Sequence, residues 1–552
     1  MAFITIFSFI GFTALVALVA WYATRKTDEK SADGYFLGGR SLGGLTIAGS
    51  LLLTNLSAEQ IVGLNGQAFS EGIMVMAWET LAAIAIIFGA IFLLPKYMKS
   101  GITTIPEFIE IRFDAQTKSI LSILFLFAYG VILLPTILYS GSIAFSTMFD
   151  IPGVLGMSEW VVIWICVWCI GSIGIIYAIF GGLKAVAVSD LINAFGLLIG
   201  GLLIPIFGLL LIGDGNIISG LTELWNNNPN KFEMKGAVDS SIPFTGTVLT
   251  GMMVAQIYYW GTNQSILQRV FAAKSLKQGQ QGMLLAALVK FLIPVIVVLP
   301  GIIAWHHFDG RLENADQAYP ALVKEVLPGG LVGFFAAVLF GAVLSSFNSL
   351  LNSSATLFGV DLFKPFFKSD ATELETVKAG KKFGLFLGLI SMSIAPFIFY
   401  ASDGLFDYIQ RSLGSMSVPI LAVVLVGMFT KKVPAIAAKT IMIADVVLYV
   451  ISIVFLEPYY RDSATEIATQ RGITNVKELS LIQANAYPHF LEVMGVLFIL
   501  SIIYMLIMSK ISPKKTAYEP RITEAIDVTP WKYAIIVGVG ITVLVMATYF
   551  IF

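Results

Sequence analysis

The sequence has little charge and few of the residues that metal or redox chemistry uses. Only 12% of its 552 residues are charged, and it contains two cysteines and three histidines. An ordinary soluble protein has about 25% charged residues. The net charge of -1 provides no basic surface for a phosphate backbone, so we expect no nucleic-acid partner. The composition also argues against a protein whose main solvent is water.

The two cysteines, Cys166 and Cys169, lie inside an unbroken apolar run. Two residues are too few for a disulfide framework. Their spacing would fit one edge of a metal site, but the three histidines lie in distant stretches, His306 and His307 in one and His489 in another. We interpret both cysteines as small packing residues at lipid depth.

Long apolar runs fill the rest of the chain, and 57% of the residues are hydrophobic. A helix needs about 20 predominantly apolar residues to cross a bilayer. The sequence predicts an all-α membrane protein of about fourteen spans, near residues 4–23, 44–70, 73–95, 119–148, 158–180, 190–212, 243–262, 280–305, 329–361, 379–400, 404–429, 433–456, 489–509 and 531–552.

The basic residues predict the orientation. Arg25 and Lys26 follow the first apolar run, whereas a secretory signal has basic residues before it, so the run is expected to remain as a span. Most of the 34 Lys and Arg residues fall in alternate loops, beginning with the loop after the first span. Because cytoplasmic loops carry the basic excess, we predict a multi-pass protein of the cytoplasmic membrane with both termini outside.

The larger loops divide between the two sides of the membrane. We expect external segments at 213–242, 306–328 and 457–488, and cytoplasmic ones at 96–118, 510–530 and 263–279, the last including Arg269. None is long enough for a catalytic domain, so we do not expect an enzyme. Neither the loops nor the spans indicate an oligomeric state.

Several charged residues lie where lipid would be expected. Burying a charge at this depth is costly, so each of these residues is a candidate for a functional role. Glu79 stands near the start of the third span and Lys290 within the eighth, and two interpretations are open: the two charges neutralise one another, or they bind a solute. The complete set is Glu59, Glu79, Asp190, Lys290, Asp407 and Arg411.

A polar run, Thr54 to Gln60, interrupts the second span. A helix broken at mid-depth frees carbonyls that can coordinate a cation and presents side chains to a substrate. The alternative is a polar packing face between helices. The seventh span has a similar interruption at Gln256, Tyr258, Tyr259, Trp260 and Asn263. Two unusual spans five apart predict an inverted repeat of spans two to six and seven to eleven.

The ninth span contributes hydroxyl groups. Ser345 and Ser346 follow Gly341-Ala342-Val343-Leu344, and Asn348, Asn352 and Ser353 come after them. Hydroxyl oxygens are hard ligands that suit an alkali cation. Packing of small residues between helices is the alternative interpretation.

These residues resemble the sodium:solute symporter family, including its sodium/galactose and sodium/glucose cotransporters. The similarity extends over nearly the whole chain. Its most specific elements are Asn-Leu-Ser-Ala-Glu-Gln (55–60), Thr-Ile-Pro-Glu-Phe (104–108), Tyr-Ala-Ile-Phe-Gly-Gly-Leu (177–183), Tyr-Tyr-Trp-Gly-Thr-Asn-Gln (258–264) and Leu-Asn-Ser-Ser-Ala-Thr (351–356).

The resemblance implies a leucine-transporter-like core of two inverted five-helix repeats at residues 31–430. One additional span would precede it (1–30), and further spans would follow it (431–552). It also implies Na+ as the coupling ion, with Asp190 on its inward path. The implied sodium ligands are the carbonyls of Leu53, Leu56 and Ala342 and the hydroxyls of Ser345 and Ser346.

The resemblance further implies a solute site and two gates. Tyr259 matches an inner aromatic gate with Trp260 beside it, and Leu64 and Tyr129 match the outer lid. Gln256 stands where galactose-transporting relatives have Asn, and Leu64 where they have Met. The implied solute-binding residues are Asn55, Ser57, Gln60, Glu79, Gln256, Lys290 and Gln410.

The resulting hypothesis is a sodium-coupled symporter that imports a small polar organic solute, in first place a monosaccharide such as glucose or galactose, by alternating access. Inositol, sialic acid or another polar compound are the alternative solutes. A solute sensor without transport is the alternative class. A channel fits less well, because discontinuous spans replace the continuous pore that it would need.

Overall fold

The structure is a computed structural model that describes residues 2–24, 36–234, 242, 248–312, 314–400, 405–520 and 526–551. Over these residues the chain is almost entirely helical. It has no strands there beyond two isolated bridges, Leu42 with Ala273 and Ser275 with Asp527. The all-α class predicted from the apolar runs is confirmed.

Within the described ranges, 9 helices are long and apolar enough to cross a membrane, or 11 if each of two bent helix pairs is one span. Shorter apolar helices at Phe7–Tyr22 and Ala534–Phe550 coincide with the first and last predicted spans. The seventh predicted span is helical from residue 248. The chain is therefore a multi-pass membrane protein, while the number fourteen stays a prediction.

The first half of the predicted core starts with the broken second span and ends with one very long helix. Residues 159–178 and 186–212 of that helix each suffice for a span. The helices are α3 (Gly44–Asn55), α4 (Ala58–Glu71), α5 (Ala77–Phe88), α8 (Ala115–Phe127), α9 (Leu134–Met148) and α11 (Glu159–Ile212).

The second half contains the seventh to eleventh predicted spans. Its helices are α14 (Met253–Gly261), α15 (Gln264–Phe271), α16 (Leu276–Leu292), α17 (Pro294–Val297), α18 (Leu299–His307), α20 (Gly329–Thr356), α21 (Glu373–Ile394) and α22 (Leu405–Phe429). Helix α3 packs against α16, α20 and α11, so the broken span lies at the centre of the bundle.

The flanking helices pack on this core. Helix α1 (Ala2–Thr24) lies along α20 and α11, and α27 (Ala534–Ile551) packs on α16 and α5. Helix α23 (Ala435–Val450) packs on α22 and α26 (Phe490–Ile511). The division at residues 31, 430 and 431 stays a prediction.

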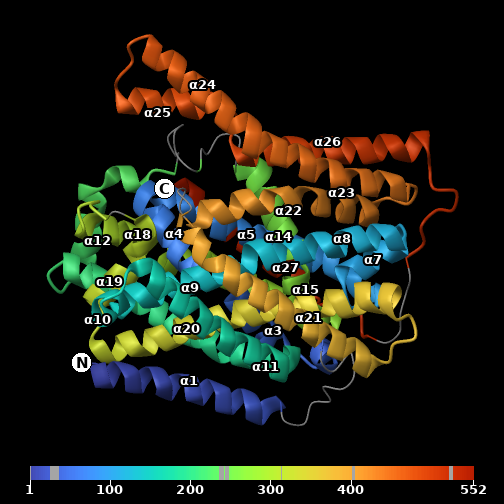
Figure 1. Cartoon of the computed structure of the whole chain (residues 1–552), viewed down its shortest axis with the longest axis horizontal. Coiled ribbons are helices and arrows are strands. Elements are labelled where there is room, and N and C mark those ends of the chain that lie inside the picture. Colours follow the sequence, from blue (N-terminus) through green and yellow to red (C-terminus); the bar gives the residue numbers. More distant parts are fainter. Residues whose placement is uncertain are drawn as a thin grey trace.

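Segments that the basic residues assign to opposite sides lie at opposite ends of the bundle. Helices α12 (Ile217–Asn227), α19 (Ala318–Val326), α24 (Glu457–Gln470) and α25 (Val476–Asn485) lie at the left in Figure 1. Helix α7 (Ile105–Arg112) lies at the right, where the cytoplasmic loops were expected. The pattern supports the alternation of loops between the two ends of the bundle.

Three helix interruptions shape the core. Helices α3 and α4 meet at 56°, with Leu56 and Ser57 between them. Helices α14 and α15 are separated by Thr262 and Asn263, and the Asn263 side chain caps α15 by accepting from the Ser265 N–H. Both breaks occur in the spans whose polar runs predicted them.

The third interruption was not predicted. The eighth span bends by 45° between α16 and α17. Pro294 begins α17 and has no N–H for the Lys290 carbonyl, which accepts from Ile293 instead. The bend therefore lies one turn after Lys290.

Candidate functional site

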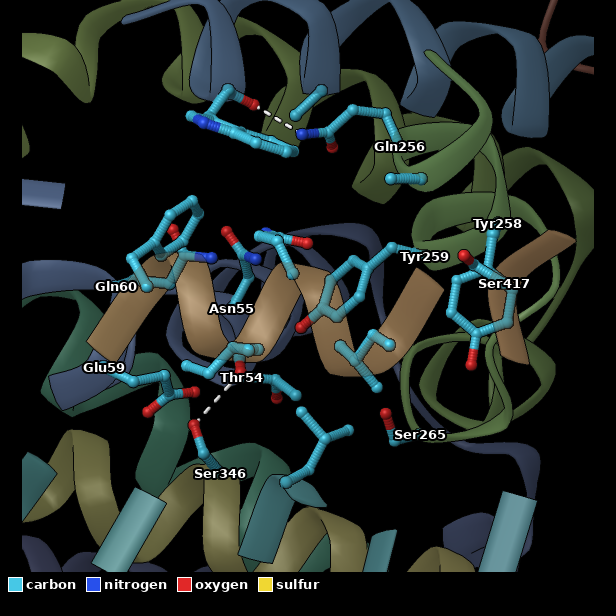
Figure 2. Close-up of a pocket in the computed structure, with 18 of the residues that line it drawn as sticks. Thr54, Asn55, Glu59, Gln60, Gln256, Tyr258, Tyr259, Ser265, Ser346 and Ser417 are labelled. Atoms are coloured by element: carbon cyan, nitrogen blue, oxygen red, sulfur yellow. Dashed lines mark hydrogen bonds between the residues drawn. The ribbon is translucent and has the colours of Figure 1, made fainter. Parts of the chain in front are cut away.

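A pocket lies beside the break between α3 and α4 (Figure 2). Most of the predicted solute-binding residues line it, together with aromatic and aliphatic side chains from both halves of the core. The lining residues are Thr54, Asn55, Glu59, Gln60, Trp78, Glu79, Ala82, Leu133, Ile137, Ala255, Gln256, Tyr258, Tyr259, Ser265, Lys290, Ser346, Leu350, Phe406, Ile409, Gln410, Leu413 and Ser417.

An ion pair joins two helices of the pocket wall. The Lys290 ammonium on α16 donates to the Glu79 carboxylate on α5, and both side chains are buried. The ammonium also lies 5.6 Å from the Trp260 ring centroid. The two charges do neutralise one another, as one interpretation of the sequence held, and both still line the pocket.

Amide side chains supply further polar groups. Within the described part of the chain, Asn55 Oδ1 and Gln60 Oε1 are buried and have no hydrogen-bond partner. Gln256 Nε2 donates to the Trp78 carbonyl at 2.8 Å, which ties α14 to α5. A hydroxyl-rich solute would satisfy the free oxygens, because burying an unpaired polar group is costly. Gln410 lines the same pocket from α22.

The predicted sodium ligands meet where α3 ends against α20. Ser346 donates to the Thr54 carbonyl at 3.0 Å, so the two helices are in direct contact (Figure 2). The Ser345 hydroxyl is buried without a partner among the described residues. Leu53, Leu56 and Ala342 are also buried.

The break explains why carbonyls are available there. In a continuous helix the Leu53 carbonyl would accept from the Ser57 N–H. Ser57 is instead extended, with φ -90° and ψ -178°. The set of hard oxygen donors fits an alkali cation. Ser57 itself is buried at the break and does not line the pocket.

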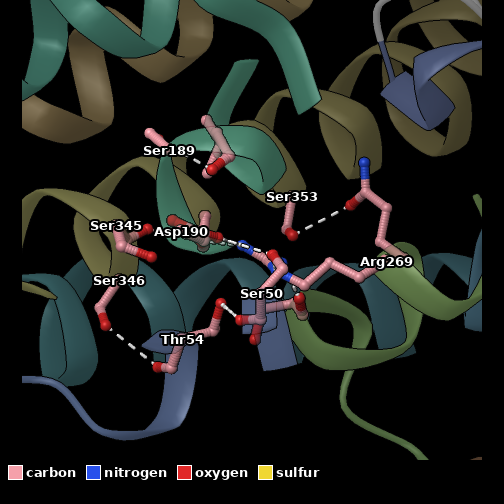
Figure 3. Close-up of polar contacts among 12 residues, drawn as sticks. Ser50, Thr54, Ser189, Asp190, Arg269, Ser345, Ser346 and Ser353 are labelled. Atoms are coloured by element: carbon pink, nitrogen blue, oxygen red, sulfur yellow. Dashed lines mark hydrogen bonds and ion pairs between the residues drawn. The ribbon is translucent and has the colours of Figure 1, made fainter. Parts of the chain in front are cut away.

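Asp190 on α11 lies beside this region in a buried polar network (Figure 3). Its Oδ2 accepts from Ser50 at 2.6 Å and lies 4.0 Å from Arg269 Nη2. Arg269 Nε also donates to Ser50, at 2.8 Å, and its other nitrogens donate to the Ser265 carbonyl and the Ser349 hydroxyl.

The position of Arg269 corrects the sequence analysis, which counted it with the basic residues of a cytoplasmic loop. It belongs to α15 and is 0% exposed. Its charge is tolerated because Asp190 and hydroxyl and carbonyl oxygens from α3, α15 and α20 surround it. The network joins four helices next to Ser345 and Ser346.

The predicted gate residues occupy different places. Tyr259 lines the pocket, and Trp260 is buried behind it, with ring centroids 5.2 Å apart. Leu64 is buried on α4, one turn beyond Gln60.

Tyr129 contacts the break between α14 and α15. Its hydroxyl donates to Asn263 Oδ1 at 2.7 Å and accepts from the Ser265 N–H at 3.1 Å. It therefore holds the α14–α15 break, next to the segment expected in the cytoplasm. Leu64 lies on α4, the other half of the broken span, and an outer lid formed by Leu64 and Tyr129 stays a prediction.

Two aromatic residues that the sequence analysis missed line the pocket instead. Trp78 and Phe406 pack edge to face, with ring centroids 5.3 Å apart. Each precedes a membrane-depth acid, Glu79 or Asp407, and that adjacency was the available signal. Aromatic residues in apolar runs otherwise look like lipid-facing ones.

Comparisons with known proteins identify the family of the chain. The family model described as the sodium:solute symporter family matches residues 35–444. The uncharacterized symporter YidK of Escherichia coli (strain K12) is 41% identical over 544 residues, covering 99% of this chain and 90% of that protein. A sodium/glucose cotransporter of Vibrio parahaemolyticus is 35% identical over 461 residues, covering 78% and 82%.

Two further similarities are more distant. The human sodium/myo-inositol cotransporter 2 is 30% identical over 451 residues, covering 76% of this chain and 65% of that protein. The solved structure of a Na+-coupled sialic acid symporter, substrate-bound and outward-open, covers 93% of this chain and 98% of that one, with a TM-score of 0.70 at 22% identity. This shared fold confirms the predicted leucine-transporter-like class.

The matching family and relatives are transporters, in agreement with the expectation that the chain is not an enzyme, and sodium is the coupling ion. The family also supports a small-molecule solute as the partner of this chain. By the extent of the family match and by the identity to these relatives, the chain belongs to the sodium:solute symporter family.

Proposed function

We propose that the protein imports a small polar organic solute with sodium across the cytoplasmic membrane, with both termini outside. A monosaccharide such as glucose or galactose is the solute we favour. One observation carries this choice: buried amide oxygens, the Glu79–Lys290 pair and the Tyr259 ring surround a single pocket. Sugars offer hydroxyls to the polar groups and an apolar face to the ring.

The geometry supports a coupling mechanism at the broken span. A sodium ion held by carbonyls of α3 and hydroxyls of α20 would stabilise the contact that Ser346 makes with Thr54. The adjacent Asn55 faces the solute, so each ligand would favour the arrangement that the other needs. One sodium moving down about 100 mV supplies roughly 2.3 kcal/mol for accumulation.

Closure would follow from residues at the two ends of the pocket. Tyr259 would close the inner side, and the Trp78–Phe406 pair the outer side. Release inside would require the α14–α15 break, held by Tyr129 and Asn263, to move away from α3.

Inositol is the second candidate, since a sodium/myo-inositol cotransporter is among the relatives and a polyol offers the same hydroxyls. A pyranose has an apolar face that can stack on the Tyr259 ring, whereas inositol carries hydroxyl groups all around its ring, so we favour the pyranose.

Uptake by proteoliposomes that contain the pure protein tests the proposal. Labelled glucose, galactose, myo-inositol and sialic acid would be offered with and without an inward sodium gradient. We expect sodium-dependent accumulation of a monosaccharide. Sodium-independent uptake would contradict the coupling to sodium. Uptake of inositol alone would make inositol, and not a monosaccharide, the transported solute. Solute binding without uptake would indicate a sensor.

A further inference from the structure

Glu59 lies at the junction of the predicted sodium site and the solute pocket. We propose that its carboxylate supplies the sodium site with a negative charge that no basic residue neutralises, and that ion and solute affect one another through this residue. The inference rests on the proposed sodium-coupled function.

The position of Glu59 follows from the helix break. It is the second residue of α4, three residues after Leu56, whose carbonyl is a predicted ligand. It lines the pocket together with Thr54 and Ser346. Figure 2 shows its carboxyl group pointing toward Ser346, which donates to the Thr54 carbonyl at 3.0 Å. The carboxyl group therefore faces the contact between α3 and α20.

The other buried acids near the pocket already have basic partners. Asp190 lies 4.0 Å from Arg269 and accepts from Ser50. Glu79 accepts from the Lys290 ammonium. Glu59 has no basic partner among the residues that the structure describes, and its Oε2 is buried without a hydrogen bond. It is the one charge at this junction that still needs a cation.

A carboxylate would strengthen the predicted sodium site. All five predicted ligands are neutral, three carbonyls and two hydroxyls, and a cation in a site of low dielectric constant is stabilised strongly by a nearby anion. The carbonyl end of α3 favours the ion, whereas the amino end of α4 carries partial positive charge. Glu59 stands in the first turn of α4, where a carboxylate offsets that charge.

The same carboxylate can transmit the presence of sodium to the solute. With the ion bound, Glu59 would be held toward Ser346, leaving the neighbouring Gln60 and Asn55 to the solute. Without the ion, an unpaired charge would remain in the pocket wall and disfavour closure around a neutral solute. Sodium and solute would then bind better together than apart.

Direct binding of radioactive sodium to the purified protein, without solute, tests the inference. We expect Glu59→Gln to weaken sodium binding by about tenfold or more, because losing a neighbouring charge costs a buried ion at least that much. Glu59→Asp should recover part of the loss, since it keeps the charge. Glu71→Gln, at the far end of α4, is the matched control and should bind sodium normally.

Solute affinity at saturating sodium is the second measurement, and it should change little in Glu59→Gln. Sodium affinity within about twofold of the unmodified protein would overturn the inference. So would a loss confined to solute binding, which would make Glu59 a solute contact, for example for an ammonium group. If the unmodified protein bound no sodium, the proposed function itself would fail, so the two failures are distinguishable.

Discussion

At the scale of single residues, hydroxyl groups connect the sodium site to the helix contact. Ser346 both donates to Thr54 and is a predicted ligand. We expect Ser346→Ala to raise the sodium concentration for half-maximal uptake by about tenfold, through loss of one ligand and one hydrogen bond. Ser142→Ala is the control, because that buried hydroxyl only donates to the Leu138 carbonyl of its own helix. Equal sodium dependence of both variants would remove Ser346 from the site.

Gln60 tests the solute side. Its Oε1 is free in the pocket wall. Gln60→Ala should weaken solute binding by about 5- to 20-fold, which corresponds to one or two hydrogen bonds between neutral groups. Sodium binding in the absence of solute should be unaffected. Competition against a bound labelled solute measures the change, and an unaltered affinity would contradict the assignment.

Lys231 predicts a pH dependence outside the membrane. Its ammonium donates to the Phe69 carbonyl at 2.9 Å at the end of α4 and lies 3.6 Å from the Trp305 ring centroid. Burial lowers the pKa of Lys231 from 10.5 to about 8, and the Glu71 carboxylate opposes part of this shift.

The sign of the effect follows from the bound protons. Between pH 8 and 10.5 the unfolded chain keeps the Lys231 proton and the folded protein has lost it, so this group makes unfolding harder as pH rises. Relative to Lys231→Met, the unmodified protein should gain thermal stability across that window. Unfolding temperatures of the two proteins in detergent that change in parallel with pH would contradict this prediction.

At the scale of elements, the interruptions differ in how visible they are in the sequence. The α3–α4 break was predictable because Thr54 to Gln60 places polar residues where lipid-facing helices have none. The α16–α17 bend was missed because Pro294 stands in an otherwise apolar run, although its missing N–H is a physical signal.

The Arg269 network was also missed, and its contacts show why. Ser50, Ser349 and Asp190 come from three helices far apart in sequence. A basic residue in a short polar segment looks like a cytoplasmic loop residue until the tertiary contacts are known. The contact between Trp78 and Phe406 is tertiary as well, so the sequence offers only the adjacency of each ring to a membrane-depth acid.

The network predicts a large stability effect. Arg269→Gln should destabilise the protein by about 3–5 kcal/mol, because it leaves the buried Asp190 charge without its partner. Combining it with Asp190→Asn should recover much of the loss, since both charges are then absent. Thermal unfolding of the three variants gives the coupling between the sites. If the stability losses of the two single variants added up in the double variant, Arg269 and Asp190 would not stabilise one another.

At the scale of the whole molecule, the apolar runs were sufficient for the all-α membrane class, whereas the solute-binding residues were predicted through the resemblance to the sodium:solute symporter family. Asn55, Gln60, Glu79, Gln256, Lys290 and Gln410 do line one pocket. The sequence could not predict that Tyr129 contacts the α14–α15 break, since that depends on how the segment Ala128–Leu133 between α8 and α9 packs against Asn263 and Ser265.

The central claim is that sodium and solute share one arrangement of α3 and α20. Measuring sodium affinity with and without solute, and solute affinity with and without sodium, tests it most directly. Because coupling between two binding sites is reciprocal, we predict that solute raises the affinity for sodium and sodium raises the affinity for solute by the same factor, about 5- to 150-fold for typical coupled sites. If neither ligand altered the affinity for the other, the account would be contradicted.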